Sequence, residues 1–89
     1  MNKLEVLKTA LTGREEEIAG YQLNIDNYVL AIKQIQEQNT TDSDVDVALR
    51  QFAEQLQKLL SEHIIEKAKT KVLYDVIKAQ VQELESTTI

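Results

Sequence analysis

The chain of 89 residues contains no cysteine, no proline and only two glycines, Gly13 and Gly20. Without cysteine it can form neither disulfides nor thiolate metal sites. Proline and glycine are the residues that most disfavour a helix interior, so their scarcity predicts long, uninterrupted helices. A chain of this length forms one small domain with a small core. We therefore expect it to gain stability by forming a homo-oligomer.

Reactive side chains are also few, which argues against several functions. His63 is the only histidine, and there is no glycine-rich loop. These features leave little scope for nucleophilic or phosphoryl-transfer catalysis, so we expect no enzyme activity, no catalytic residue and no cofactor. A lone histidine beside Glu62 and Glu66 is a weak candidate for a metal site, and we interpret His63 as a residue at the boundary of a helix face.

Charge and hydropathy exclude two classes of partner. The formal net charge of −5 disfavours duplex DNA, which binds basic surfaces. No apolar run is long enough to cross a membrane, and the first residues do not resemble a signal peptide. We therefore expect a cytoplasmic protein that does not bind membranes.

A regular apolar pattern fills the first half of the chain. Apolar or aromatic residues recur in alternating steps of three and four, and Arg14 is the one charged residue in the series. The ten positions are Leu4, Leu7, Leu11, Arg14, Ile18, Tyr21, Ile25, Tyr28, Ile32 and Ile35. This heptad pattern predicts a helix over about residues 2–38 that packs in a coiled coil or bundle.

The residues around Gly13 leave two alternatives open. Thr12 and Glu15 have the spacing of a capping box, and the acidic run that begins at Glu15 suits a helix N-terminus. A short first helix could therefore end near residues 12–13. The unbroken heptad phase instead favours one continuous helix.

The second half begins with a polar cluster, Asn39–Asp44, which predicts a turn at about residues 39–43. Ser43 is a candidate N-cap for a second helix over about residues 44–86. The expected main apolar stripe is Val45, Leu49, Phe52, Leu56, Leu59, Leu60, Ile64, Ala68, Val72, Val76 and Leu84. A second set joins it toward the C-terminus, namely Ile65, Leu73, Ile77 and Val81. A helix that is apolar over a wide arc usually contacts more than one neighbour.

Together these features predict an all-α fold. The short turn requires the two helices to lie antiparallel as a long hairpin. A lone hairpin covers only one face of each helix. We therefore expect heptad-patterned hairpins to assemble into a homo-oligomeric helical bundle, either a four-helix dimer or a larger ring.

Candidate binding residues lie on both predicted helices. Lys67 and Lys71 share a helix face, which is either a solvated surface or an anion subsite. Arg14 is either an interface residue that extends to solvent or an anion-binding group.

Tyr21 and Tyr28 either pack in the interface or widen it enough to admit a flat ligand. Gly20 stands beside Tyr21, and a glycine in a helix costs about 1 kcal/mol relative to alanine. We expect this cost to reflect a close approach to the backbone there, by another helix or by a ligand.

The segment Glu17–Leu23, "EIAGYQL", followed by "AIK" at Ala31–Lys33, resembles part of a phage family. These are small helical, oligomeric sponges of cyclic oligonucleotides that block CBASS immunity. The resemblance implies that Tyr21 stacks on a base and that Lys33 contacts phosphate. It also suggests Gln22 as a polar contact, with Lys67 or Lys71 supplying an equivalent charge.

Two hypotheses about function follow. In the first, the protein is a non-catalytic oligomeric binding protein, a phage sponge that sequesters a cyclic di- or trinucleotide and so blocks host CBASS defence. In the second, it is a coiled-coil adaptor, assembly or inhibitor protein that acts through contacts with another protein, such as a host protein.

Overall fold

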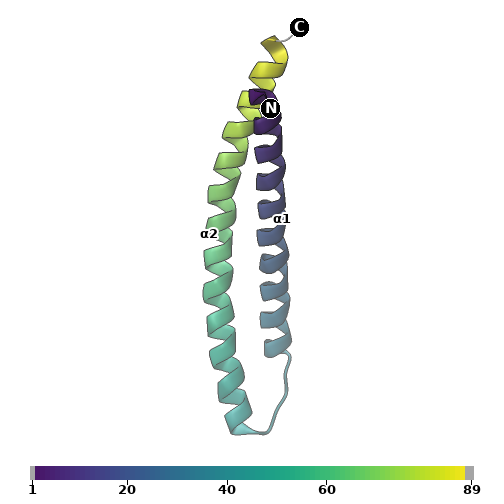
Figure 1. Cartoon of the computed structure of the whole chain (residues 1–89). Coiled ribbons are helices and arrows are strands. Elements are labelled where there is room, and N and C mark those ends of the chain that lie inside the picture. The colour runs from purple at the N-terminus through teal and green to yellow at the C-terminus, as the bar shows by residue number, and fades with distance from the viewer. Residues whose placement is uncertain (1, 88–89) are drawn as a thin grey trace.

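The computed structural model describes residues 2–87 and consists of two long helices without strands in that range. Helix α1 spans Lys3–Gln36 and helix α2 spans Ser43–Thr87. They lie side by side and antiparallel, so the beginning of α1 and the end of α2 meet at one end of the molecule (Figure 1). The hairpin is elongated, with dimensions of 69 × 18 × 14 Å.

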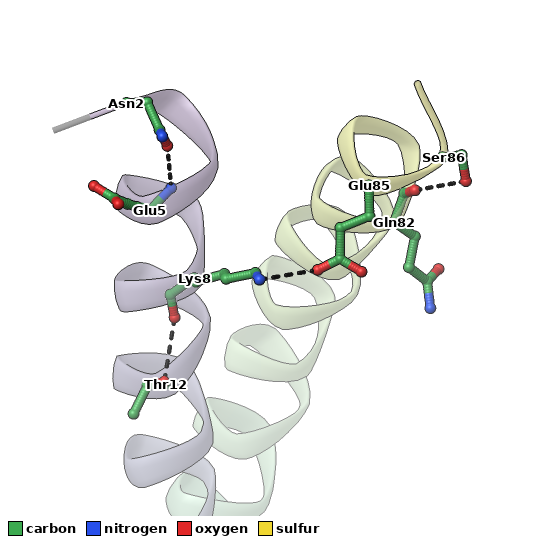
Figure 2. A network of polar contacts seen from close by, with 7 residues as sticks. All are labelled: Asn2, Glu5, Lys8, Thr12, Gln82, Glu85 and Ser86. Atoms are coloured by element: carbon green, nitrogen blue, oxygen red, sulfur yellow. Dashed lines mark hydrogen bonds and ion pairs between the residues drawn. The ribbon is translucent and has the colours of Figure 1, made fainter. Parts of the chain in front are cut away.

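Each helix begins at a side-chain cap. Asn2 Oδ1 accepts a hydrogen bond from the Glu5 backbone N–H at 2.8 Å, which satisfies one of the free donors of the first turn of α1 (Figure 2). At the start of α2, Asp42 Oδ1 accepts from the N–H groups of Asp44 at 3.0 Å and Val45 at 3.2 Å. The cap is therefore Asp42, and the expectation that Ser43 would serve as the N-cap was wrong.

Helix α1 runs without interruption through residues 12–13, where the sequence allowed either a break or a continuous helix. The Thr12 hydroxyl donates to the Lys8 carbonyl at 3.2 Å, the bond of a threonine inside a helix and not of an N-cap (Figure 2). Neither glycine has a positive φ. At the open end, Lys8 Nζ also lies 3.2 Å from Glu85 Oε1, which links the beginning of α1 to the end of α2.

The surroundings of Gly20 within the hairpin do not explain why a glycine, which destabilises a helix, stands at this position. A Cβ built at this position would meet nothing within 4 Å, and Gly20 is exposed. The expected close approach of another helix is therefore absent in the hairpin, because α2 packs against a different side of α1.

The inner side of α1 is the one that its apolar pattern indicates. All ten positions of the series from Leu4 to Ile35 are partly covered, whereas most of the residues between them are exposed. No residue of α1 is fully buried, because a single neighbouring helix covers only part of its surface.

The inner side of α2 differs from the expected stripe. Residues of reduced exposure recur in steps of four and three at Leu49, Ala53, Leu56, Leu60, His63, Lys67, Thr70, Tyr74, Ile77, Val81 and Leu84. The expected stripe advanced from Leu56 to Val76 in steps of four only. Each such step exceeds a full turn by about 40°, so five steps lead about 200° around the helix, away from α1.

The core of the hairpin is therefore thin. Among residues 2–87, Leu56 and Val81 are the buried apolar residues, at 5% and 7% exposure, and Thr70, which lies between them in the sequence of α2, is buried as well. Many large apolar side chains of both helices stay at least one-third exposed. Over the described residues, neither helix contains a stretch that is both long and apolar enough to cross a membrane.

Candidate ligand-binding groove

The interface between the two helices is polar and aromatic in the middle of the hairpin, whereas it is aliphatic at both ends. His63 of α2 lies between two tyrosines of α1, with its ring centroid 5.8 Å from that of Tyr21 and 5.1 Å from that of Tyr28. Both contacts are edge-to-face, a favourable geometry for aromatic pairs. Nδ1 of His63 lies 2.8 Å from the Leu59 carbonyl oxygen, and since a carbonyl only accepts, Nδ1 donates. The histidine is thus an inner residue that holds both tyrosines, and not the boundary residue that we expected.

One turn further along α2, a polar contact joins the helices. Lys67 Nζ donates to Gln22 Oε1, and Gln22 Nε2 donates in turn to Asp26 Oδ1 at 2.8 Å. Gln22 therefore lies between a cation of α2 and a carboxylate of its own helix. The lysine stem lies at an inner position while its ammonium group reaches the edge of the interface, as long basic side chains commonly do.

Lys67 borders a shallow groove along this edge, with a volume of about 420 Å³. Ile18 and Ala19 give it apolar walls, and Lys71 and Tyr74 continue it along α2. The complete lining is Glu15, Ile18, Ala19, Gln22, Lys67, Lys71 and Tyr74. We call this the lysine groove.

Local partners hold the polar groups of the lysine groove. Lys71 Nζ lies 2.5 Å from Asp75 Oδ1 and 5.3 Å from the centroid of the Tyr74 ring. The Tyr74 hydroxyl donates to Glu15 Oε1 at 3.4 Å, a long hydrogen bond. Exposed ion pairs contribute at most about 1 kcal/mol, so the Lys71–Asp75 pair can open at little cost when a stronger anion arrives.

The structure brings three of the six candidate binding residues together. Gln22, Lys67 and Lys71 all line the lysine groove. Arg14 lies outside the lining, and its guanidinium pairs with Glu17 of the same helix at 2.9 Å.

The other two candidates are not neighbours of each other. The Tyr21 ring packs inward on His63, whereas Lys33 is exposed and lines a different shallow groove with Val29 and Gln57. Twelve residues separate Tyr21 from Lys33, which corresponds to about 18 Å along a helix.

Sequence reasoning missed the other two polar residues of the lysine groove, Tyr74 and Glu15. A signal for the first was present, because Lys67, Lys71 and Tyr74 stand at i, i+4 and i+7 and so share a helix face. The apolar stripe predicted for α2 lies on another side of the helix and therefore gives no indication of this face.

Two further observations bound the site. A groove of about 460 Å³ lies near the turn, but its one cation, Arg50, is outnumbered there by the carboxylates of Asp46 and Glu54, whereas the lysine groove holds two lysines and one carboxylate. Within residues 2–87, no three histidine or acidic side chains are grouped so as to hold a metal ion. The lysine groove is therefore the strongest candidate for a binding site.

Comparisons of the chain with protein family models, with curated proteins and with solved structures find no match.

Proposed function

We propose that this protein is a non-catalytic, cytoplasmic binding protein that takes a small anionic ligand in the lysine groove. The observation that carries the proposal is the convergence of Lys67 and Lys71 with Gln22 and Tyr74 over an apolar wall. Ammonium groups pair with phosphate oxygens, the amide offers a hydrogen bond, and a tyrosine ring offers a surface for a base. A phosphate-bearing nucleotide combines the three chemistries.

A cyclic di- or trinucleotide is the narrower ligand that we propose, on the strength of the resemblance to phage sponges. In such a role the protein would sequester the signal and block host CBASS defence. Within one chain, Tyr74 stands beside the lysines, whereas Tyr21 is occupied by His63. We therefore assign the base-stacking role in the groove to Tyr74.

Isothermal titration with a panel of cyclic di- and trinucleotides tests the proposal, with thermal shift as a second readout. We expect binding that Lys71→Ala weakens about 10-fold or more, because one lysine–phosphate contact is lost. Lys3→Ala, which removes an exposed charge at the start of α1, is the matched control and should leave binding unchanged. Binding that is lost in Lys33→Ala but kept in Lys71→Ala would move the ligand to the residues of the resemblance. The absence of both a heat signal and a thermal shift at tens of micromolar ligand would refute the nucleotide proposal.

The second candidate function is that of an adaptor, assembly or inhibitor protein. Leu23 and Leu30 favour it, because these two leucines of α1 are 61% and 58% exposed and stand seven residues apart on one helix face. Exposed apolar residues at this spacing suit the groove or seam of a partner helix. A protein that co-purifies with the native chain, and is lost with Leu23→Glu and Leu30→Glu together, would support this role. Its retention by the double variant would exclude this face.

A further inference from the structure

Helix α2 carries a second apolar surface on the side that faces away from α1. We call it the outer stripe and define it by seven residues, Val45, Phe52, Leu59, Ile65, Val72, Leu73 and Val76. Their side chains are between 37% and 62% exposed. Counted with the 3.5-residue period that the inner positions follow, the outer stripe covers an arc of about 100°, the width of the apolar face that a surface helix usually buries. It extends about 47 Å along the axis.

The exposed area of the hairpin is large enough for a second protomer to cover part of it. The chain exposes 6678 Å². A compact monomer of the same mass, 10.2 kDa, exposes about 5,300 Å². The excess of about 1,400 Å² is larger than the roughly 800 Å² per partner that a standard stable interface covers.

The order of residues in the outer stripe suits a second copy of α2 that runs in the opposite direction. When Leu59 lies on a two-fold axis, Val45 of each copy faces Leu73 of the other, because both are fourteen residues from Leu59. The same axis places Phe52 opposite the aliphatic stem of Glu66. A two-fold axis pairs like surfaces in this reciprocal way, which is the commonest symmetry of homo-oligomers.

Charge agrees with the antiparallel direction. Residues 40–52, which comprise the end of the turn and the beginning of α2, contain three aspartates and Arg50, a net charge of −2. Residues 66–78 contain four lysines and two acidic residues, a net charge of +2. The two-fold axis at Leu59 sets each of these segments opposite the other. A parallel pair would instead set the acidic segments against each other.

We propose that the outer stripe is the dimer interface of this protein, in which a second copy of α2 packs antiparallel across a two-fold axis at Leu59. The dimer is then a four-helix assembly with the two α2 helices in the centre. The lysine groove lies on the other flank of α2, so each protomer keeps its groove open to solvent. This assembly goes beyond the proposed ligand function and does not depend on it.

Molar mass in solution is the first test. Light scattering with size exclusion at tens of micromolar should give a dimer of twice 10.2 kDa. Leu73→Glu should give a monomer, since the new carboxylate lies in the interface and near the partner's acidic segment. Ile64→Glu is the matched control, with the same 50% exposure on the same helix but on the opposite flank, and it should remain a dimer. A monomeric native chain, or a dimeric Leu73→Glu, would overturn the proposal.

Disulfide trapping tests the register without a disruptive substitution, and the native chain has no cysteine to interfere. Oxidised Leu59→Cys should form covalent dimers, because two cysteines on the axis come within disulfide range. Val45→Cys alone should not, since its two copies are separated by about 42 Å along the helices. A mixture of Val45→Cys and Leu73→Cys chains should cross-link. Ile64→Cys serves as the control for random collision. Cross-linking of Val45→Cys alone would indicate a parallel pair and overturn the antiparallel assignment, as would failure of Leu59→Cys.

Discussion

The two helices distribute their apolar residues in opposite ways. Helix α1 places nine apolar or aromatic residues at the ten inner positions of its heptad series, and only Arg14 departs. Helix α2 places four polar or aromatic residues at consecutive inner positions, His63, Lys67, Thr70 and Tyr74, while large aliphatic side chains lie on its outer side. Outside its inner positions α1 leaves four large apolar residues exposed, Val6, Leu23, Val29 and Leu30, whereas α2 leaves more than twice as many. The hairpin therefore leaves more apolar surface of α2 than of α1 uncovered.

The largest change in stability is expected for a substitution on the inner side of α2, and it tests whether this side faces α1. Leu56→Ala should reduce the free energy of unfolding by about 2–4 kcal/mol, because Leu56 is 5% exposed and its removal leaves a cavity. Ile64→Ala, at 50% exposure, should cost less than about 0.5 kcal/mol. Urea unfolding followed by circular dichroism measures both. Equal costs would mean that α2 faces α1 with a different side.

A smaller loss is expected from the aromatic contact on α1. Tyr21→Ala should cost about 1–2 kcal/mol, less than a fully buried aromatic residue, because the ring is partly covered and packs edge-on against His63. Tyr21→Phe keeps the ring and should be nearly neutral. An unchanged melting temperature for Tyr21→Ala would rule out interface packing as the role of this tyrosine.

Substitution of Lys67 is expected to raise the stability of the hairpin, unlike the two preceding substitutions. Lys67→Leu should stabilise the hairpin by about 1 kcal/mol, since a lysine at an inner position sets specificity at a cost in stability. The same substitution should abolish anion binding in the lysine groove. Thermal melting gives the first result and titration calorimetry the second. A destabilised Lys67→Leu would show that the bond to Gln22 contributes more than aliphatic packing would.

The smallest effect concerns the helix backbone of α1. Gly20→Ala should raise the free energy of unfolding by roughly 0.5–1 kcal/mol, because alanine is the better helix former and the added Cβ has open space. Gly13→Ala meets equally open space and provides the parallel case. If Gly20→Ala instead weakened ligand binding or assembly, a ligand or a second protomer would have to approach the backbone there.

Much of the architecture could be read from the residues alone. The lack of proline, the scarcity of glycine and the polar cluster before Val45 predicted two helices joined by a short turn, and the structure is such an all-helical hairpin. The side of α1 that faces α2 could also be predicted, because nine of its thirteen large apolar or aromatic residues follow one period. Gln22, Lys67 and Lys71 were identified as candidates from charge, helical spacing and the resemblance, and they line one groove.

Only the packing of the two helices could show which side of α2 is the inner one. The sequence of α2 supports two apolar arcs, and the one rich in large aliphatic residues would be chosen on hydrophobicity alone. In the hairpin, the inner side must keep the period of α1 over its whole length, and this condition selects the series that contains His63, Lys67 and Thr70. The local sequence therefore determines that each segment forms a helix. The packing of the two helices along a shared period determines which residues of α1 and α2 are in contact, and it leaves the outer stripe of α2 uncovered.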